Sequence, residues 1–289
     1  MSRDLHLNEL GEFLKARRAS LSPADVGLPT VSEPPRRVTG LRREEVALLA
    51  SISTEYYARI EQGRLQASTP VLVDLARVLR LDADQHTYLF ELAAKNDLPP
   101  HTTRQQVDPQ LQFLLDDLGT SPAVVVGRRT DVLAWNQLGA ALFADFGRIP
   151  ENRRVYIRML FTDPALRDLY VDWEEVAHLG IAQLRMESAR YPGDPQLIAL
   201  VEELSALDAQ FRRWWTEHHV AARTLGTKRL RHPVVGELTL GWSALGCAGD
   251  PDQHIIAWTA PPGSPSHDAL RLLASWAADQ NLMSSSSPS

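Results

Sequence analysis

The first 95 residues follow the spacing of short amphipathic helices. Between Leu7 and Leu14, apolar residues recur at intervals of three or four, which places them on one face of a helix. Four further helices are predicted in "LRREEVALLA" (41–50), "TEYYARIEQG" (54–63), "STPVLVDLARVLRLD" (68–82) and "DADQHTYLFELAAKN" (82–96). No strand-like stretch separates them, so we expect an all-α domain of five helices over residues 1–95.

Local signals mark where these helices begin and end. Ser53 is a natural N-cap for the segment that follows it, and Gly63 is a natural stop. Residues 20–38 are rich in proline and glycine, which predicts an ordered loop or a flexible insertion between the first and second helices. Within it, Arg36 and Arg37 either reach DNA or belong to a solvated loop.

The pattern changes after a polar, proline-rich segment at 96–109, which has the composition of a linker. Residues 121–136, "SPAVVVGRRTDVLAWN", hold two apolar runs around a turn and predict a hairpin. A helical block over 151–225 follows, and then three strand signals and a closing helix. Residues 110–280 are therefore predicted to form an α+β domain with an antiparallel sheet, and 281–289 a disordered tail.

Composition narrows the class of protein. The chain has 289 residues, with 44% hydrophobic and 23% charged, which suits two globular domains. Its single cysteine, Cys247, excludes an internal disulfide and fits a reducing compartment. The N-terminus lacks a signal-peptide pattern, and no apolar run of about 18 residues occurs. We expect a cytoplasmic protein without a membrane partner, associated with the nucleoid when it is bound to DNA.

The net charge of −6 argues against a chain that coats nucleic acid by bulk charge. The charge is unevenly placed, however, because residues 1–95 carry 13 Lys+Arg against 13 Asp+Glu, and all the excess acid lies beyond them. The stretch "RRVTGLRR" (36–43) holds four arginines and no acid. A local basic patch on a neutral domain is sufficient for a specific DNA binder.

The second and third predicted helices have the spacing of a helix-turn-helix, although a plain helical hairpin would show the same periodicity. The residues predicted to pack inward are Val46, Ala47, Ala50, Ile52, Tyr57 and Ile60. Those predicted to contact DNA are Arg42, Arg43, Ser53, Thr54, Glu55, Tyr56, Arg59, Gln62 and Arg64.

Each predicted DNA contact has a chemical reason. Arg59 is suited to a guanine edge, Glu55 to a cytosine amino group and Thr54 to a thymine methyl or a phosphate. Tyr56 is predicted to face the groove. The remaining candidates (Arg42, Arg43, Ser53, Gln62 and Arg64) suit phosphate contacts.

These residues carry a family resemblance. Residues 41–64 resemble the helix-turn-helix of the XRE/Cro-type repressors. The longer stretch "LGEFLKARRASLSPADVGLP…RRVTGLRREEVALLASISTEYYARIEQGR" resembles the actinobacterial MmyB-like transcription regulators, which carry the same insertion. The hairpin at 121–136 resembles the start of that family's PAS-like ligand-binding domain. The resemblance implies a DNA-binding regulator with a PAS-like effector domain that contains a helical insertion.

Fatty acids are the ligand class associated with the fold of this family, so a fatty-acid-like effector is expected. A pocket for such a ligand needs an aromatic wall and a few polar groups, with Arg or His to meet a carboxylate. The candidates are Trp135, Asn136, Arg185, Met186, Trp214, Trp215, His218 and Arg223. Each of these residues is also compatible with a structural role, and adjacent residues such as Trp214 and Trp215 point about 100° apart on a helix.

An enzyme and a DNA-bound scaffold are the two other function classes. For an enzyme, "GWSALG" (241–246) departs from the G-x-S-x-G nucleophile motif, and no phosphate-binding glycine loop occurs. The adjacent histidines 218 and 219 lack the spacing of metal ligands on a helix, so no catalytic residue, metal or cofactor is expected. A DNA-bound scaffold, whose C-terminal domain only dimerises or binds a protein partner, is the alternative. We expect a homodimer, because helix-turn-helix modules usually bind two half-sites.

Overall fold

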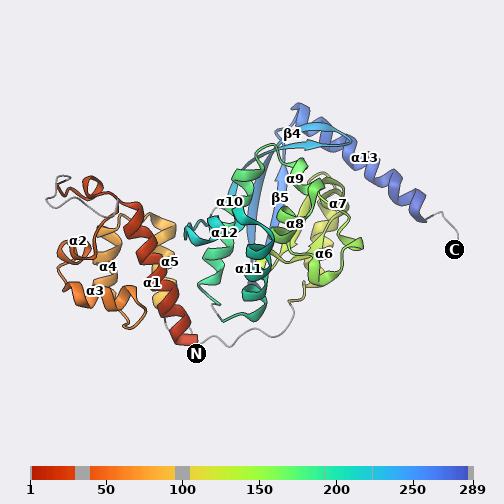
Figure 1. Ribbon diagram of the computed structural model, residues 1–289. Helices are drawn as coiled ribbons and strands as arrows, with labels where there is room; N and C mark the ends of the chain where they lie inside the picture. Colours follow the sequence, from red (N-terminus) through yellow and green to blue (C-terminus); the bar gives the residue numbers. More distant parts are fainter. Residues whose placement is uncertain (1, 30–39, 95–104, 192, 223, 286–289) are drawn as a thin grey trace. The chain divides into compact units, whose positions relative to one another are not determined.

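A computed structural model describes residues 2–29, 40–94, 105–191, 193–222 and 224–285 of the chain, which divides into two compact units (Figure 1). We call "first unit" the described residues of Met1–His101 and Ile181–Ala222. We call "second unit" those of Thr102–Gly180 and Arg223–Ser289. No helix within these described ranges is both long and apolar enough to cross a membrane.

The N-terminal part of the first unit has the five predicted helices. They are α1 (Ser2–Ser20), α2 (Arg43–Leu49), α3 (Thr54–Glu61), α4 (Thr69–Val78) and α5 (Ala83–Ala93). The inward positions are confirmed: Val46, Tyr57 and Ile60 are fully buried in one core with residues of α1, α4 and α5. The all-α expectation for this part of the chain is therefore correct.

The ends of these helices follow the sequence signals. The Ser53 hydroxyl accepts a hydrogen bond from the Tyr56 amide at 3.1 Å, and Asp82 accepts one from the Gln85 amide at 2.9 Å. Gly63 ends α3 with φ of +68°. The insertion contains a short 3₁₀ turn, Pro23–Val26, which the proline and glycine content did not predict. Residues 30–39, including Arg36 and Arg37, lie outside the described residues.

The first unit also contains helices from much later in the chain. These are the residues of α10 (Trp173–Ser188) from Ile181 onward, α11 (Pro195–Leu207) and α12 (Ala209–Thr216). Ala189 and Val220 are buried in the same core as α1 and α5, and Met186 packs against it. The first unit is thus larger than the 1–95 domain expected from sequence periodicity.

The second unit is built on a five-stranded antiparallel sheet with the order β2-β1-β5-β4-β3. Its strands are β1 (Ala123–Val126), β2 (Val132–Trp135), β3 (Leu225–His232), β4 (Gly236–Cys247) and β5 (Asp250–Thr259). Val124 lies opposite Ile256, and Trp242 lies opposite Trp258. The hairpin 121–136 and the three late strands are therefore confirmed, and this antiparallel sheet is the expected PAS-like one.

Helices cover both faces of the sheet. They are α6 (Pro109–Asp117), α7 (Gln137–Leu142), α8 (Tyr156–Thr162), α9 (Pro164–Leu169) and α13 (Pro265–Ser285). Short 3₁₀ turns lie at Arg128–Thr130, Phe146–Arg148 and Glu151–Arg153. Leu115 of α6 packs on Val125 and Ile255, while Phe143, after α7, packs on Trp258 from the other face. Residues 95–104, most of the expected linker, lie outside the described residues.

Candidate functional site

The turn between α2 and α3 brings the two helices together in the helix-turn-helix arrangement. Ser51 takes φ of +56°, and the Ile52 amide then donates to the Ala47 carbonyl at 3.0 Å. Ile52 packs against the core as the turn residue, and Ser53 caps α3. The joint is fixed by backbone hydrogen bonds, so the orientation of α3 depends directly on α2.

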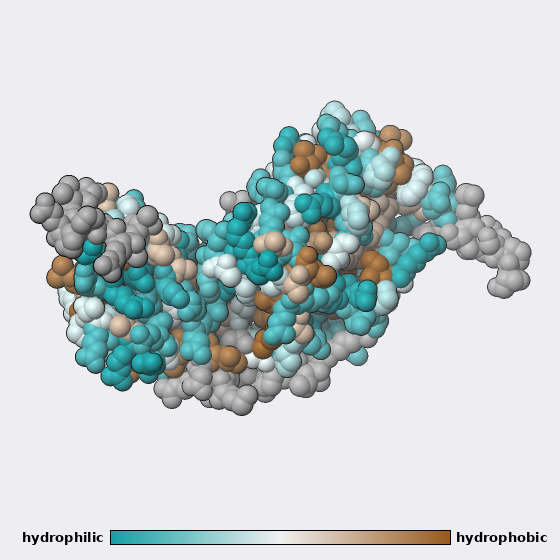
Figure 2. All heavy atoms as spheres, in the orientation of Figure 1, coloured by the Kyte–Doolittle hydropathy of each residue, from teal (hydrophilic) through white to brown (hydrophobic). Residues whose placement is uncertain are grey.

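The side of α3 opposite to the core is polar. Thr54, Glu55 and Arg59 are exposed and Tyr56 is half-buried, while Tyr57 and Ile60 between them are buried. Gln62 and Arg64, directly after the helix, are also exposed. Figure 2 shows a mainly hydrophilic surface over α2 and α3. The structure therefore presents these predicted DNA-contact residues on one accessible surface.

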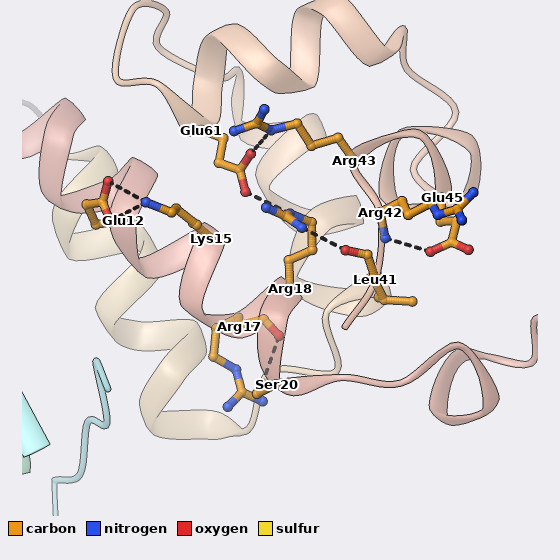
Figure 3. A network of polar contacts seen from close by, with 10 residues as sticks. All are labelled: Glu12, Lys15, Arg17, Arg18, Ser20, Leu41, Arg42, Arg43, Glu45 and Glu61. Carbon is orange, nitrogen blue, oxygen red and sulfur yellow. Dashed lines mark hydrogen bonds and ion pairs between the residues drawn. The ribbon is translucent and has the colours of Figure 1, made fainter. Parts of the chain in front are cut away.

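A buried carboxylate fixes the C-terminal end of α3 (Figure 3). The side chain of Glu61 is 0% exposed, and it accepts hydrogen bonds from Arg18 Nε at 2.7 Å and from Arg43 Nε. Arg18 also donates to the Leu41 carbonyl at 2.7 Å. Because Arg18 belongs to α1 and Arg43 to α2, this one carboxylate ties three helices together. Two arginines satisfy its charge, which a buried carboxylate requires.

Burial of the Tyr57 hydroxyl next to Glu61 raises the pKa of that phenol far above its ordinary value, so Tyr57 is neutral at physiological pH. The backbone amide of Arg42 donates to Glu45 at 2.6 Å, and its guanidinium lies 3.3 Å from Glu44. The side chains of Arg42 and Arg43 keep 31% and 43% of their surface exposed. Both arginines are thus partly engaged within the domain, and part of each guanidinium-bearing side chain is still accessible to a phosphate.

A second polar cluster in the first unit involves three of the residues expected to bind a ligand. Arg185 is 1% exposed and donates to the carboxylate of Glu9 in α1 and to the Trp215 carbonyl. Its guanidinium lies over the Trp215 ring, 4.0 Å from the centroid. His218 Nδ1 lies 3.3 Å from the Glu9 carboxylate, and the Tyr88 hydroxyl donates to Glu9 at 2.9 Å.

These partners outweigh the cost of burying Glu9 and lower the pKa of its carboxyl to about 2. The burial itself would raise that pKa, but hydrogen bonding to His218 and the charge of Arg185 lower it by more. The carboxylate that Arg185 meets in this structure therefore belongs to Glu9. A ligand carboxylate at this position would compete with an ion pair that already exists.

The other ligand candidates belong to other parts of the chain. Trp135 and Asn136 belong to the second unit, Trp214 is buried, and Met186 packs in the core of the first unit. Arg223 lies outside the described residues. Trp215 stacks on Phe211, with ring centroids 6.0 Å apart. Of the described candidates, Trp135 and Asn136 thus belong to the second unit and the other five to the first unit, and their contact with a ligand stays a prediction.

The Asn136 side chain is a structural anchor of the second unit. Its oxygen accepts hydrogen bonds from the amides of Ala123 and Gly139 at 3.0 and 2.8 Å. Its nitrogen donates to the carbonyls of Leu118 and Ser121 at 2.9 and 2.8 Å. Two lone pairs and two N–H groups are all that an amide side chain offers. Asn136 therefore caps α7 and ties it to β1, with no hydrogen-bonding capacity left over.

An aromatic cluster that sequence reasoning missed lies in the second unit. Phe143 contacts Trp258 of β5, Tyr156 of α8 and Tyr170, with centroid distances of 4.5, 6.3 and 6.5 Å. The hydroxyls of Tyr156 and Tyr170 form a hydrogen bond with one another. Phe143, Tyr170 and Trp258 are each at most 9% exposed. No short motif marks this cluster, because its members come from separate helices and a strand.

Comparison with protein families accounts for both units. The family described as "MmyB-like transcription regulator ligand binding domain" matches residues 107–273, which is more than half of the chain. The chain belongs to the MmyB-like transcription regulators. A family described as "Helix-turn-helix domain" matches residues 9–89. No curated protein sequence matches the chain.

As an MmyB-like regulator, the protein combines a DNA-binding domain with a ligand-binding domain and is not an enzyme. The expected family is therefore confirmed. The ligand-binding match includes residues 181–222, which belong to the first compact unit together with the helix-turn-helix. Glu217 Oε2 lies 3.6 Å from His219 Nε2, so an acidic group is present beside the adjacent histidines 218 and 219. The expectation that the protein holds no metal stays a prediction.

Proposed function

We propose that this regulator binds operator DNA as a homodimer through α3 and changes its DNA affinity when the ligand-binding domain takes up a fatty-acid-like molecule. The arrangement of α3 carries the first part of the proposal. Its polar residues are exposed over the first turns, while Tyr57 and Ile60 hold the opposite side in the core. A recognition helix in the major groove needs this division, with N-terminal residues facing the bases.

Specific roles follow from side-chain chemistry. Arg59 reads a guanine edge with a pair of hydrogen bonds, and Thr54 and Glu55 contact neighbouring positions. Arg64 and Gln62 hold phosphates beyond the helix end, and Arg42, Arg43 and Ser53 hold phosphates at its beginning. Tyr56 lies beside the groove. The protein acts in the cytoplasm and is associated with the nucleoid while it is bound to DNA.

The homodimer is proposed because one helix-turn-helix gives few contacts. Typical specific affinities require a larger interface, and two modules on half-sites about one helical turn apart provide it. The experiment is light scattering of the purified protein, followed by selection of binding sites from a random duplex pool. Palindromic selected sites and a dimer mass support the proposal, whereas a monomer mass with single half-sites contradicts it.

The fatty-acid-like ligand is proposed because the matched family is a ligand-binding domain and the second unit is rich in buried aromatic side chains. Residues 181–222 offer a connection, since they are part of the ligand-binding match and pack on α1 and α5 in the first unit. A ligand that stabilises one arrangement of these helices shifts DNA affinity only by its differential affinity for the two states.

The test is native mass spectrometry of the protein purified from its own host, followed by identification of any released molecule. A co-purified fatty acid that changes operator affinity supports the sensor. A dimer that binds its operator equally well with and without a panel of fatty acids contradicts the ligand class. That result favours the scaffold alternative, in which the C-terminal part dimerises or binds a protein partner.

A further inference from the structure

The two tyrosines of the aromatic cluster reach one another from segments attached to different edges of the sheet. Val155, directly before Tyr156, pairs through its backbone with Asp131 next to the edge strand β2. Tyr170 pairs through its own backbone with Leu230 of β3, which is the opposite edge strand. The Tyr156 and Tyr170 hydroxyls nevertheless share a hydrogen bond. The fold therefore brings two phenol hydroxyls together from segments that are attached to opposite edges of the sheet.

The hydrogen-bonding capacity of this pair is incompletely used. Each phenol has one O–H to donate, and within a pair only one of the two protons is shared. In the part of the chain that the structure describes, neither hydroxyl has another hydrogen-bond partner. One O–H donor is therefore left over next to the Phe143 ring, where an unsatisfied donor is costly.

The surroundings of this O–H group define which hydrogen-bond acceptor it can bind. Burial raises the pKa of both phenols above their ordinary value, so both keep their protons at physiological pH and act as donors. Tyr170 is 5% exposed and Tyr156 is half-buried, so part of the Tyr156 residue lies at the protein surface. Phe143, whose ring contacts both tyrosine rings and Trp258, provides apolar contact area. A fitting partner is an oxygen acceptor attached to an apolar body.

We propose that Tyr156 and Tyr170 bind the head group of the effector, an acceptor oxygen of a carboxyl or carbonyl group, while the aromatic cluster contacts its apolar part. This inference rests on the proposed ligand-sensing function and names the subsite that function uses. It also moves head-group recognition away from the residues expected from the sequence. Arg185 and His218 face Glu9, and the Asn136 amide is fully occupied.

The location gives the subsite a mechanical consequence. The segments that carry Tyr156 and Tyr170 are attached to strands β2 and β3 at opposite edges of one sheet. A ligand oxygen that takes the spare O–H strengthens the link between these segments. The residue after Tyr170 also donates its amide to the Arg229 carbonyl of β3 at 3.1 Å, so the second segment has little freedom of its own.

The test compares dodecanoic acid with dodecylamine, which has the same chain but only a donor head group at neutral pH. Titration calorimetry is carried out on the full chain and on Tyr156→Phe, Tyr170→Phe and the double variant. Tyr191→Phe is the matched control, since it removes a phenol hydroxyl from the first unit. We expect dodecanoic acid to bind the double variant roughly tenfold more weakly than the unchanged chain, and the control to bind normally.

A second measurement distinguishes the loss of the subsite from a loss of folding in the variants. Tyr→Phe keeps the ring contacts with Phe143, and a tyrosine ultraviolet difference spectrum of the unchanged chain with dodecanoic acid reports the phenols directly. A spectral change that is lost in Tyr156→Phe supports the subsite. Equal binding of dodecanoic acid by all variants overturns the subsite and leaves the sensor proposal intact. No binding of dodecanoic acid by the unchanged chain overturns the proposed ligand class and this inference together.

Discussion

Arg185 and Glu9 form an ion pair between residues that are 176 positions apart in the chain, inside one compact unit. Arg185 lies within the residues that match the ligand-binding family, and Glu9 lies on α1, which also carries Arg18. Arg18 in turn binds Glu61 at the end of α3. A short series of contacts thus leads from a helix of the ligand-binding match to α3, the proposed recognition helix.

The first prediction concerns the pH dependence of this pair. The pKa of Glu9 is lowered from 4.5 to about 2, so its ionised form stabilises the fold above pH 4.5. That contribution is lost as the pH falls from 4.5 towards 2. Glu9→Gln should lower the free energy of unfolding by about 3 kcal/mol at pH 7, because the buried charge of Arg185 is left without its carboxylate partner. The loss should shrink as the pH approaches 2, measured by urea unfolding.

The control is Glu12→Gln on the same helix, whose exposed carboxylate pairs with Lys15 and contributes little. A loss at pH 7 that is no larger for Glu9→Gln than for Glu12→Gln would show that the buried pair does not stabilise the first unit.

The second prediction separates the two arginines that bind Glu61. Arg18 is 14% exposed and Arg43 is 43% exposed. Arg18→Ala should therefore destabilise the protein by about 3 kcal/mol, and Arg43→Ala by about 1 kcal/mol or less. Operator affinity should fall in Arg43→Ala under conditions where the variant is fully folded, because a phosphate contact is removed. Thermal unfolding measures the loss of stability, and fluorescence anisotropy measures operator affinity. Equal losses of stability in the two variants would show that the burial of an arginine does not decide how much it stabilises the fold.

The third prediction distinguishes base reading from phosphate binding. Arg59→Ala should cost about 1–3 kcal/mol on the selected operator and relax the preference at one base pair. Arg64→Ala should weaken all duplexes alike and lower the salt slope by about 1. Anisotropy titrations on the operator and its single-base variants, at several salt concentrations, measure both. Unchanged discrimination in Arg59→Ala removes Arg59 from the set of base contacts.

The fourth prediction tests the structural role of Asn136. Asn136→Ala leaves buried amides and carbonyls without partners, so it should lower the free energy of unfolding by about 3 kcal/mol. Gln137→Ala, the exposed neighbouring position, should change it by less than about 0.5 kcal/mol. Denaturant unfolding of both variants measures this. A near-normal stability of Asn136→Ala would mean that its four hydrogen bonds are dispensable and would return it to the ligand candidates.

The fifth prediction concerns the close approach of α1 and α3. A Cβ on Gly11 would meet the backbone carbonyl of Glu61, closer than real Cβ atoms come. Gly11→Ala should therefore destabilise the protein by about 2 kcal/mol and weaken operator binding, because α3 must move. Gly119→Ala, where a Cβ meets nothing within 4 Å, is the control and should be neutral or slightly stabilising. Circular dichroism melts and anisotropy measure the outcome.

Helix α3, the proposed recognition helix, could be predicted from the sequence because its geometry depends on neighbouring residues alone. Tyr57 and Ile60 are three positions apart, and this spacing alone places them on one face and leaves Thr54, Glu55 and Arg59 on the other. Ser53 and Gly63 gave the helix ends for the same reason. Helix α6 was missed because its nine residues follow a proline-rich segment and carry only a short apolar pattern.

The ligand-binding residues were harder to predict from the sequence, because the type of a residue does not say which partner its side chain contacts. Arg185 and His218 have the chemistry to bind a carboxylate, and they do face one, but it belongs to Glu9. Trp135 and Trp215 share an aromatic character, which does not predict that the fold places them in different units.

The sequence by itself determined the five N-terminal helices, the strand segments, the outward side of α3 and the family. These follow from hydrogen bonds and apolar periodicity over a few residues, which are the same wherever the segment packs. Only the tertiary structure decided that residues 181–222 join the helix-turn-helix in one unit, that Glu61 holds two arginines, and that Tyr156 meets Tyr170. Those relationships join residues far apart in the chain, and they exist only after the apolar faces have been buried against one another.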